Sequence, residues 1–273
     1  MYQGDAPYGG CPMIRVLFFG DIYGRSGRES VKNNLSALKE EFEIDFTIAN
    51  CENMASGRGV TERTANELFA AGVDIYTSGN HLWDKKDSLA YIAKEKRILR
   101  PINYPAGAIG NRWTVIESDS GKKLGVFCLM GQIFTVACES PWRHIEDILP
   151  IISQETNAIL VDVHAEATGE KKALAYFMDG RVSAVVGTHT HVQTADEDIL
   201  PQGTAYISDV GMNGPHDSVI GVKTDIILKK QLTGMPIRFV PAETGNQINA
   251  VMIEIDEETG KAVKIVRIKR KLD

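Results

Sequence analysis

The sequence has few cysteines and lacks the marks of several protein classes. Its four cysteines form neither a Cys-x-x-Cys pair nor a dense framework: Cys11, Cys51, Cys128 and Cys138. We therefore expect reduced thiols and a cytoplasmic protein. The chain has no apolar run long enough to span a bilayer, and no leader with the charged, apolar and small-residue order of a secretory signal. This predicts that it has no membrane partner.

Positive charge is also scarce. Lys+Arg number 30 against 36 Asp+Glu, for a formal net charge of -6. That balance argues against duplex nucleic acid or an anionic membrane surface as a partner. It is compatible with a small anionic substrate, because a bound metal supplies positive charge locally. The sequence also lacks a P-loop, a dinucleotide-binding fingerprint and a Gly-x-Ser-x-Gly elbow.

The composition is that of a globular protein with a substantial core. Hydrophobic residues make up 43% and charged residues 24% of 273 residues. No Pro/Ser/Gly-rich linker and no internal repeat divides the chain, so we predict a single domain over residues 13–273. Residues 1–12 are polar and turn-rich and precede a second methionine, Met13. We interpret them as a disordered tail or a non-native extension.

Short apolar runs alternate with amphipathic stretches after Met13. We predict buried strands at 14–19, 46–50, 73–78, 124–129, 158–163 and 184–186. Helices are predicted at 30–42, 61–71 and 170–178, the second with Thr61 as a plausible N-cap. This alternation indicates an α/β protein with a largely parallel sheet covered on both faces. The segments 205–207, 247–255 and 263–268 look like antiparallel strands, which leaves room for a second sheet packed on the first.

Residues that can bind a metal gather where the predicted strands end. They are Asp21, Glu52, Asn53, Asn80, His81, His164, His189 and His191. Ligands of open α/β sheets bind outside the carboxyl ends of the strands, so these side chains are expected to meet at one edge. Each has an ordinary alternative when taken alone: a helix N-cap for Asp21, a turn residue for Asn53 or Asn80, a buried hydrogen-bonded histidine for His164. Together they favour a metal site.

The chemistry of these groups narrows the choice of metal. Carboxylate, amide and imidazole ligands suit Mn, Fe, Zn or Co better than Ca or Mg. The set exceeds what one ion needs, and two ions about 3.5–4 Å apart that share one carboxylate would use it fully. Such a pair activates a water as hydroxide, which suits phosphoester hydrolysis. In an extended segment, His189 and His191 would face the same side and could each reach a metal.

As an ordered set, these motifs resemble the calcineurin-like metallophosphoesterase superfamily and, within it, the YmdB-like family of bacterial phosphodiesterases. The segments that carry the resemblance are 19–25, 50–53, 78–81, 162–168, 187–194, 209–212 and 218–221. The resemblance covers nearly everything from Met13 onward. It implies a four-layer αββα sandwich with central β-sheets flanked by helices.

The resemblance also implies roles for the site residues. Asp21, Glu52, Asn53 and His191 would hold one metal. Glu52 as a bridge, with Asn80, His164 and His189, would hold the other. His81 would donate a proton to the leaving oxygen. The chain has Tyr23 where the wider superfamily carries a metal-binding histidine, and Glu52 where it commonly has aspartate; both features resemble the YmdB-like variant.

The implied cofactors are two divalent or mixed-valence transition-metal ions, with iron or manganese favoured over zinc. The implied substrates are small phosphodiesters, in particular 2′,3′-cyclic nucleotides, and a homo-oligomer is plausible. Two alternatives stay open: a phosphomonoester or phosphoprotein phosphatase, and a metal-containing regulatory protein that binds nucleotides with weak turnover.

Several further residues have competing interpretations. Arg58, between two glycines, is a plausible phosphate contact, whereas Arg25 and Arg28 are expected to be solvated at the surface. His144 is interpreted as non-catalytic, and His216 as a weak candidate for substrate contact. Cys51 is expected to pack, and the Lys-rich segment 264–271 to form an edge strand.

Overall fold

Two six-stranded sheets form the centre of the protein. The computed structural model describes residues 13–272, so the interpretation of residues 1–12 lies outside it. The first sheet has the order β12 (Ala262–Lys271), β11 (Asn246–Asp256), β10 (Met212–Pro215), β1 (Met13–Ile22), β2 (Phe46–Asn50) and β3 (Ile75–Thr77). The second has the order β4 (Trp113–Glu117), β5 (Lys123–Met130), β6 (Ile159–His164), β7 (Ala184–Thr188), β9 (Ala205–Ile207) and β8 (Asp198–Ile199).

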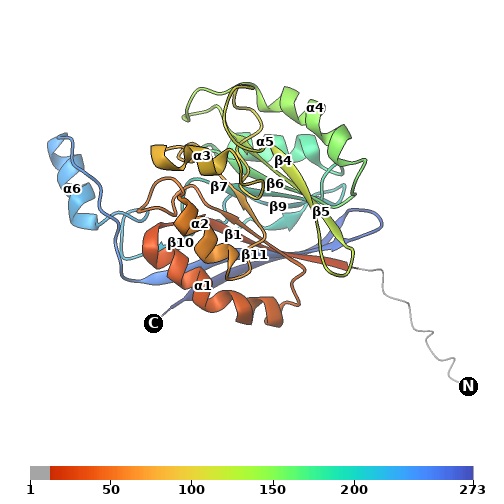
Figure 1. The fold of residues 1–273 in the computed structure, drawn as a ribbon, viewed down its shortest axis with the longest axis horizontal. Coiled ribbons are helices and arrows are strands. Elements are labelled where there is room, and N and C mark those ends of the chain that lie inside the picture. Colours follow the sequence, from red (N-terminus) through yellow and green to blue (C-terminus); the bar gives the residue numbers. More distant parts are fainter. Residues whose placement is uncertain (1–12, 273) are drawn as a thin grey trace, which may run out of the picture.

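Helices cover the outer face of each sheet (Figure 1). The described helices are α1 (Gly24–Glu41), α2 (Glu62–Phe69), the 3₁₀ turn η1 (Lys86–Ser88), α3 (Leu89–Ile92), α4 (Pro141–Ile152), α5 (Thr168–Met178) and α6 (Thr224–Thr233), of which all but α6 lie near the sheets. Apolar side chains of α1 and α2 pack on the first sheet, and those of α4 and α5 on the second. Helix α6 buries no residue and stands apart from the sheets (Figure 1). Within residues 13–272, no helix is both long and apolar enough to cross a membrane.

The main core lies between the two sheets. In β1, Ile14, Val16 and Phe18 belong to this inner cluster, whereas Leu17 and Phe19 belong to the cluster beneath α1 and α2. This alternation follows from the two-residue period of a strand, and both faces are apolar because both are covered. The expected α/β fold, with central β-sheets flanked by helices in a four-layer αββα sandwich, is confirmed.

The first helix is longer than the sequence prediction. It begins at Gly24 rather than at residue 30. Its first turns show no apolar periodicity, because the residues buried there are glycine, arginine and serine rather than large apolar side chains. The Arg28 guanidinium, for example, is buried and pairs with Glu67 of α2 at 2.8 Å. The expectation that Arg28 is solvated at the surface is therefore wrong. Thr61 caps α2 as predicted, since its hydroxyl accepts a hydrogen bond from the Thr64 amide.

Two predictions for the C-terminal strands have different outcomes. Strand β9 was expected to be antiparallel, but it pairs in parallel with β7 and only its other side, against β8, is antiparallel. Three residues are too few for their hydrophobic pattern to show which strand they pair with. The pairing depends instead on how the connecting segments cross the sheet. The antiparallel pairing of β11 with β12 is confirmed, and the Lys-rich β12 is an edge strand.

Parallel pairing brings the functional strand ends together. Strands β1, β2 and β3 are parallel neighbours, as are β5, β6 and β7. The two groups meet through a buried hydrogen bond, in which the Asn50 side-chain Nδ2 of β2 donates to the Asp162 carboxylate of β6 at 2.9 Å. The carboxyl ends of strands from both sheets therefore lie side by side, and the predicted ligands follow directly from them.

Candidate metal centre

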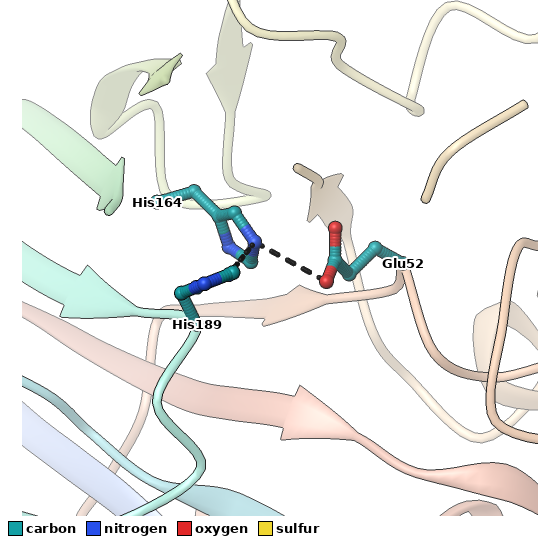
Figure 2. A group of neighbouring side chains, drawn as sticks. All are labelled: Glu52, His164 and His189. Atoms are coloured by element: carbon teal, nitrogen blue, oxygen red, sulfur yellow. Dashed lines mark hydrogen bonds and ion pairs between the residues drawn. The ribbon is translucent and has the colours of Figure 1, made fainter. Parts of the chain in front are cut away.

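Three side chains from three strand ends form the first half of the site. His164 Nε2 lies 3.2 Å from Glu52 Oε1 and 3.0 Å from His189 Nδ1. One ligand atom from each residue lies within 4.8 Å of the other two, close enough for all three to hold one ion. Figure 2 shows the two imidazole rings and the carboxylate converging on the same point.

A second group adjoins the first through Glu52. Asn53 Nδ2 lies 3.1 Å from Glu52 Oε1, 3.1 Å from His191 Nε2 and 3.4 Å from Asp21 Oδ1. His191 Nε2 is 3.8 Å from Asp21 Oδ1. Glu52 therefore contacts members of both groups, which is the position that a bridging carboxylate requires.

Asn80 supplies an independent sign that a ligand is expected. Its side-chain oxygen is buried and has no hydrogen-bond partner among the described residues. Burying an unpaired carbonyl oxygen costs about 1–3 kcal/mol, so such atoms usually have a partner. The preceding Gly79 lies against the cluster, and an added Cβ there would collide with His164 and the Glu52 carboxylate. Only glycine lets this loop approach the centre.

His189 and His191 reach the site through a strained turn. Strand β7 ends at Thr188, and both histidines have positive φ, 104° and 66°. The expected extended His-x-His geometry is therefore wrong. Such conformations are uncommon outside glycine and persist where the surroundings hold them. Here the His189 amide donates to Asp21 Oδ2 at 3.0 Å, which ties the turn to the end of β1.

Hydrogen bonds orient His164 and His191 toward the centre. His164 Nδ1 lies 2.9 Å from the Thr188 hydroxyl, which donates to buried Asp162 at 2.7 Å, so Nε2 is the nitrogen that faces Glu52 and His189. His191 Nδ1 donates to the Ile220 carbonyl at 3.0 Å, which also leaves its Nε2 facing inward. Metal-binding histidines typically have one ring nitrogen held in this way.

The electrostatics of the site shift the pKa values of its carboxylate and imidazole groups. Burial opposes ionisation of Glu52, but the neighbouring His164 outweighs it and lowers the pKa of Glu52 to about 2. Burial also disfavours charged His164, but Glu52 and then Asp21 outweigh it and raise the pKa of His164 to about 9. Burial and the charge on His164 lower the pKa of His189 to about 3. Glu52 is thus ionised and His189 neutral, which are the forms in which a carboxylate and an imidazole bind a metal, so the residues present fit metal ions.

His81 lies beside the cluster rather than in it. Its backbone amide donates to Glu52 Oε2 at 3.1 Å, and its Nδ1 lies 2.9 Å from Asp84 Oδ2. The ring lines a cavity of about 370 Å³, together with Glu52, Asn53 and His189. Because Nδ1 contacts Asp84, Nε2 is the ring nitrogen that remains for a molecule in this cavity.

The structure also places the weaker candidates. Arg58 lines the same cavity, and its contact with phosphate stays a prediction. His144 instead contacts Arg112 and Glu139, and His216 Nε2 contacts the Met212 carbonyl at 3.0 Å; neither lines this cavity. Cys51 is buried in the core beneath α1 and α2, so the expectation that it packs is confirmed.

Sequence reasoning missed the residues that support the ligands. Asp162 accepts hydrogen bonds from Asn50, Thr77 and Thr188 at 2.9, 2.6 and 2.7 Å. Buried Lys171 pairs with Asp209 at 2.8 Å and donates to the Thr188 carbonyl at 2.7 Å. Charged residues within apolar strands and helices were the available signal, since such residues are rarely buried without partners.

Replacing Asp162 is expected to lower stability. Asp162→Ala would leave three buried donors without their acceptor, at a cost of about 3 kcal/mol or more. For a chain of this size, that corresponds to a fall in melting temperature of roughly 6–12 °C. Thermal unfolding followed by circular dichroism measures the change. The exposed Asp119→Ala variant is the control, and equal melting temperatures for the two variants would refute the proposed role.

The two-sheet fold, with carboxylate, amide and imidazole groups gathered at its strand ends, defines a metallophosphoesterase. A family model described as YmdB-like protein matches residues 17–268. The chain belongs to this family.

Known relatives agree with this assignment. The chain is 45% identical, over 93% of its length and 96% of the relative's, to a Bacillus subtilis (strain 168) protein named 2′,3′-cyclic-nucleotide 2′-phosphodiesterase. A solved structure of a Mycoplasma pneumoniae protein described as a novel phosphatase has a TM-score of 0.91 and 34% identity, and covers 97% of this chain and 95% of that one. A hypothetical protein from Thermus thermophilus has a TM-score of 0.89 and 39% identity, and covers 95% and 100%. The chain is therefore a hydrolase.

Proposed function

We propose that this protein is a dinuclear metal-dependent phosphodiesterase that hydrolyses small nucleotides, in particular 2′,3′-cyclic nucleotides. The observation that carries the proposal is the position of Glu52. Its carboxylate lies 3.2 Å from His164 of one group and 3.1 Å from Asn53 of the other. One carboxylate shared by two ligand groups is typical of a two-metal centre.

Each group in the site has a proposed role. Asp21, Glu52, Asn53 and His191 would hold one ion, and Glu52, Asn80, His164 and His189 the other. When bound, the two ions would activate a water and neutralise the phosphoryl oxygens. His81 would give a proton to the leaving oxygen through Nε2 while Asp84 holds Nδ1, and Arg58 would contact the phosphate from the cavity wall.

The donor set supports iron or manganese, with zinc also compatible. All seven proposed ligands offer nitrogen or oxygen atoms, and the nearby thiol of Cys51 is buried in the core instead. Mixed imidazole and oxygen ligands suit these metals, whereas thiolate-rich sites favour zinc.

Support for a nucleotide substrate comes from the cavity and from one relative. The cavity over the centre measures about 370 Å³, within the range of sites that hold small molecules. The Bacillus subtilis relative is named for 2′,3′-cyclic nucleotides. Phosphomonoester hydrolysis is the second candidate, since the Mycoplasma pneumoniae relative is described as a phosphatase.

A comparison of two model substrates separates these candidates. We expect kcat/KM for bis-p-nitrophenyl phosphate to exceed that for p-nitrophenyl phosphate by about tenfold or more, because differential binding of the diester's second ester group lowers its barrier. We also expect turnover of 2′,3′-cyclic AMP, which chromatography of the products would measure. Protein stripped of metal is the control. Faster hydrolysis of the monoester would favour the phosphatase, and cyclic-nucleotide binding without turnover by metal-loaded protein would favour a regulatory role.

A further inference from the structure

A second cavity adjoins the one over the candidate centre. It has a volume of about 460 Å³, and four residues line both cavities: Tyr23, Gly57, Arg58 and Phe239. We call this second cavity the basic annex, because its charged lining residues are all cations: Arg58, Lys85, Lys230 and Arg238. Because four residues are common to both cavities, the annex lies directly beside the space over the metal centre.

The four cations are not neutralised within residues 13–272. No carboxylate lines the annex, and no described acidic side chain forms an ion pair with any of the four. Lys230 instead lies over the Phe239 ring, with Nζ 4.6 Å from its centroid. In a chain of net charge -6, this local excess of positive charge favours an anionic ligand.

A neighbouring cavity shows the contrast. It is lined by Arg25, Arg28, Arg63 and Lys85, but also by two carboxylates. Glu29 pairs with Arg25 at 2.7 Å, and Glu67 pairs with Arg28 at 2.8 Å. Those guanidinium groups already have partners. The side chains of the annex do not, so they can donate to a bound phosphate without first breaking an ion pair.

The residues between the two cavities can hold the rest of a nucleotide. The Tyr23 ring packs against His191 edge-on, with centroids 5.7 Å apart, and lines the cavity over the metal centre together with Arg58. Tyr23 and Phe239 present aromatic surface at the junction, and aromatic rings are common platforms for bases and sugars. The junction therefore offers two aromatic rings for a base or sugar, with Arg58 beside them, and both cavities carry groups suited to phosphate.

We propose that the basic annex binds a second phosphate of the substrate, so that the preferred substrate is a nucleotide with one phosphate in addition to the ester that is hydrolysed. This inference rests on the proposed phosphodiesterase function and specifies its substrate class. Two sources share this chemistry: a 5′-phosphate on a cyclic mononucleotide, and the internucleotide phosphate of a short oligonucleotide that ends in a 2′,3′-cyclic phosphate.

The test compares three substrates with the metal-loaded protein. They are 2′,3′-cyclic AMP, the same compound with a 5′-phosphate, and the dinucleotide ApA ending in a 2′,3′-cyclic phosphate. We expect kcat/KM to be about tenfold higher or more for at least one of the two that carry a second phosphate, and the preference to shrink as ionic strength rises. Which of the two is preferred identifies the source of the second phosphate.

Substitutions assign the preference to the annex. In Lys230→Ala/Arg238→Ala, both exposed positions, the ratio of kcat/KM with and without the second phosphate should fall at least about tenfold. The control Lys229→Ala/Arg143→Ala removes two exposed cations outside the annex and should keep the native ratio. Turnover of all three substrates at similar rates, or an unchanged ratio in the annex variant, would overturn the inference. Failure of all three substrates to react would instead contradict the proposed function.

Discussion

Glu52→Ala is expected to lose both metals and more than about 100-fold of the native turnover. Loss of a single group that merely orients a ligand typically costs 10–100-fold in metal affinity or activity. Glu52 would be a ligand to both ions, because it contacts His164 on one side and Asn53 on the other. Its loss also removes the acceptor for the His81 amide. Elemental analysis of the purified variant, beside turnover of bis-p-nitrophenyl phosphate, measures both effects.

A matched variant makes the Glu52 result specific. Glu155→Ala removes an exposed carboxylate outside the site and should retain native metal content and turnover. Circular dichroism of both variants checks that the fold is kept. If Glu52→Ala still held two ions per chain at native affinity, the bridging role would be wrong. If it held one ion, Glu52 would belong to only one of the two groups.

His81→Ala should have the opposite signature, with metals retained and turnover reduced about 10²–10⁴-fold, the usual contribution of a general acid. Its side-chain hydrogen bond is to Asp84, and it is not part of the Glu52, His164 and His189 group. We therefore expect the ring to act on the substrate rather than to bind an ion. Metal content and single-turnover rates of the same preparation measure the two properties.

The leaving group distinguishes an acid from a structural role. A p-nitrophenolate needs little protonation, whereas the alkoxide released from a 2′,3′-cyclic nucleotide needs much more. His81→Ala should therefore lose more activity with 2′,3′-cyclic AMP than with bis-p-nitrophenyl phosphate. Asp84→Asn should also lose more activity with 2′,3′-cyclic AMP than with bis-p-nitrophenyl phosphate, but both losses should be smaller. This substitution only weakens the hydrogen bond to His81 Nδ1. Equal losses with both substrates would contradict proton donation by His81.

Much of the fold and of the ligand set could be predicted from local pattern. Strand β2 has the predicted bounds, and Thr61 caps α2 as expected. The site residues were identifiable because the carboxyl ends of parallel strands lie at one edge of the sheet. A polar residue that directly follows a buried strand is therefore expected at that edge. That argument needs only the order of strands along the chain.

Prediction from the hydrophobic pattern fails where polar side chains are buried or where the helix or strand is short. The first turns of α1 were missed because Arg28 is buried by pairing with Glu67 rather than by an apolar period. The sheet partners of β9 could not be predicted from three residues. The support of His164 by Thr188 and Asp162 was missed because hydrogen bonds between separate strands leave no periodic trace.

The sequence by itself determined which groups stand at the strand ends, since alternation and strand order are local properties. Only the tertiary structure decided their geometry. The hydrogen bond from the His189 amide to Asp21 joins residues 168 positions apart, and it fixes a turn that local preference disfavours. The basic annex likewise joins Arg58 and Lys85, which follow early strands, with Lys230 and Arg238 from the α6 region. Such contacts depend on how segments far apart in the sequence pack together, and no short segment specifies that packing.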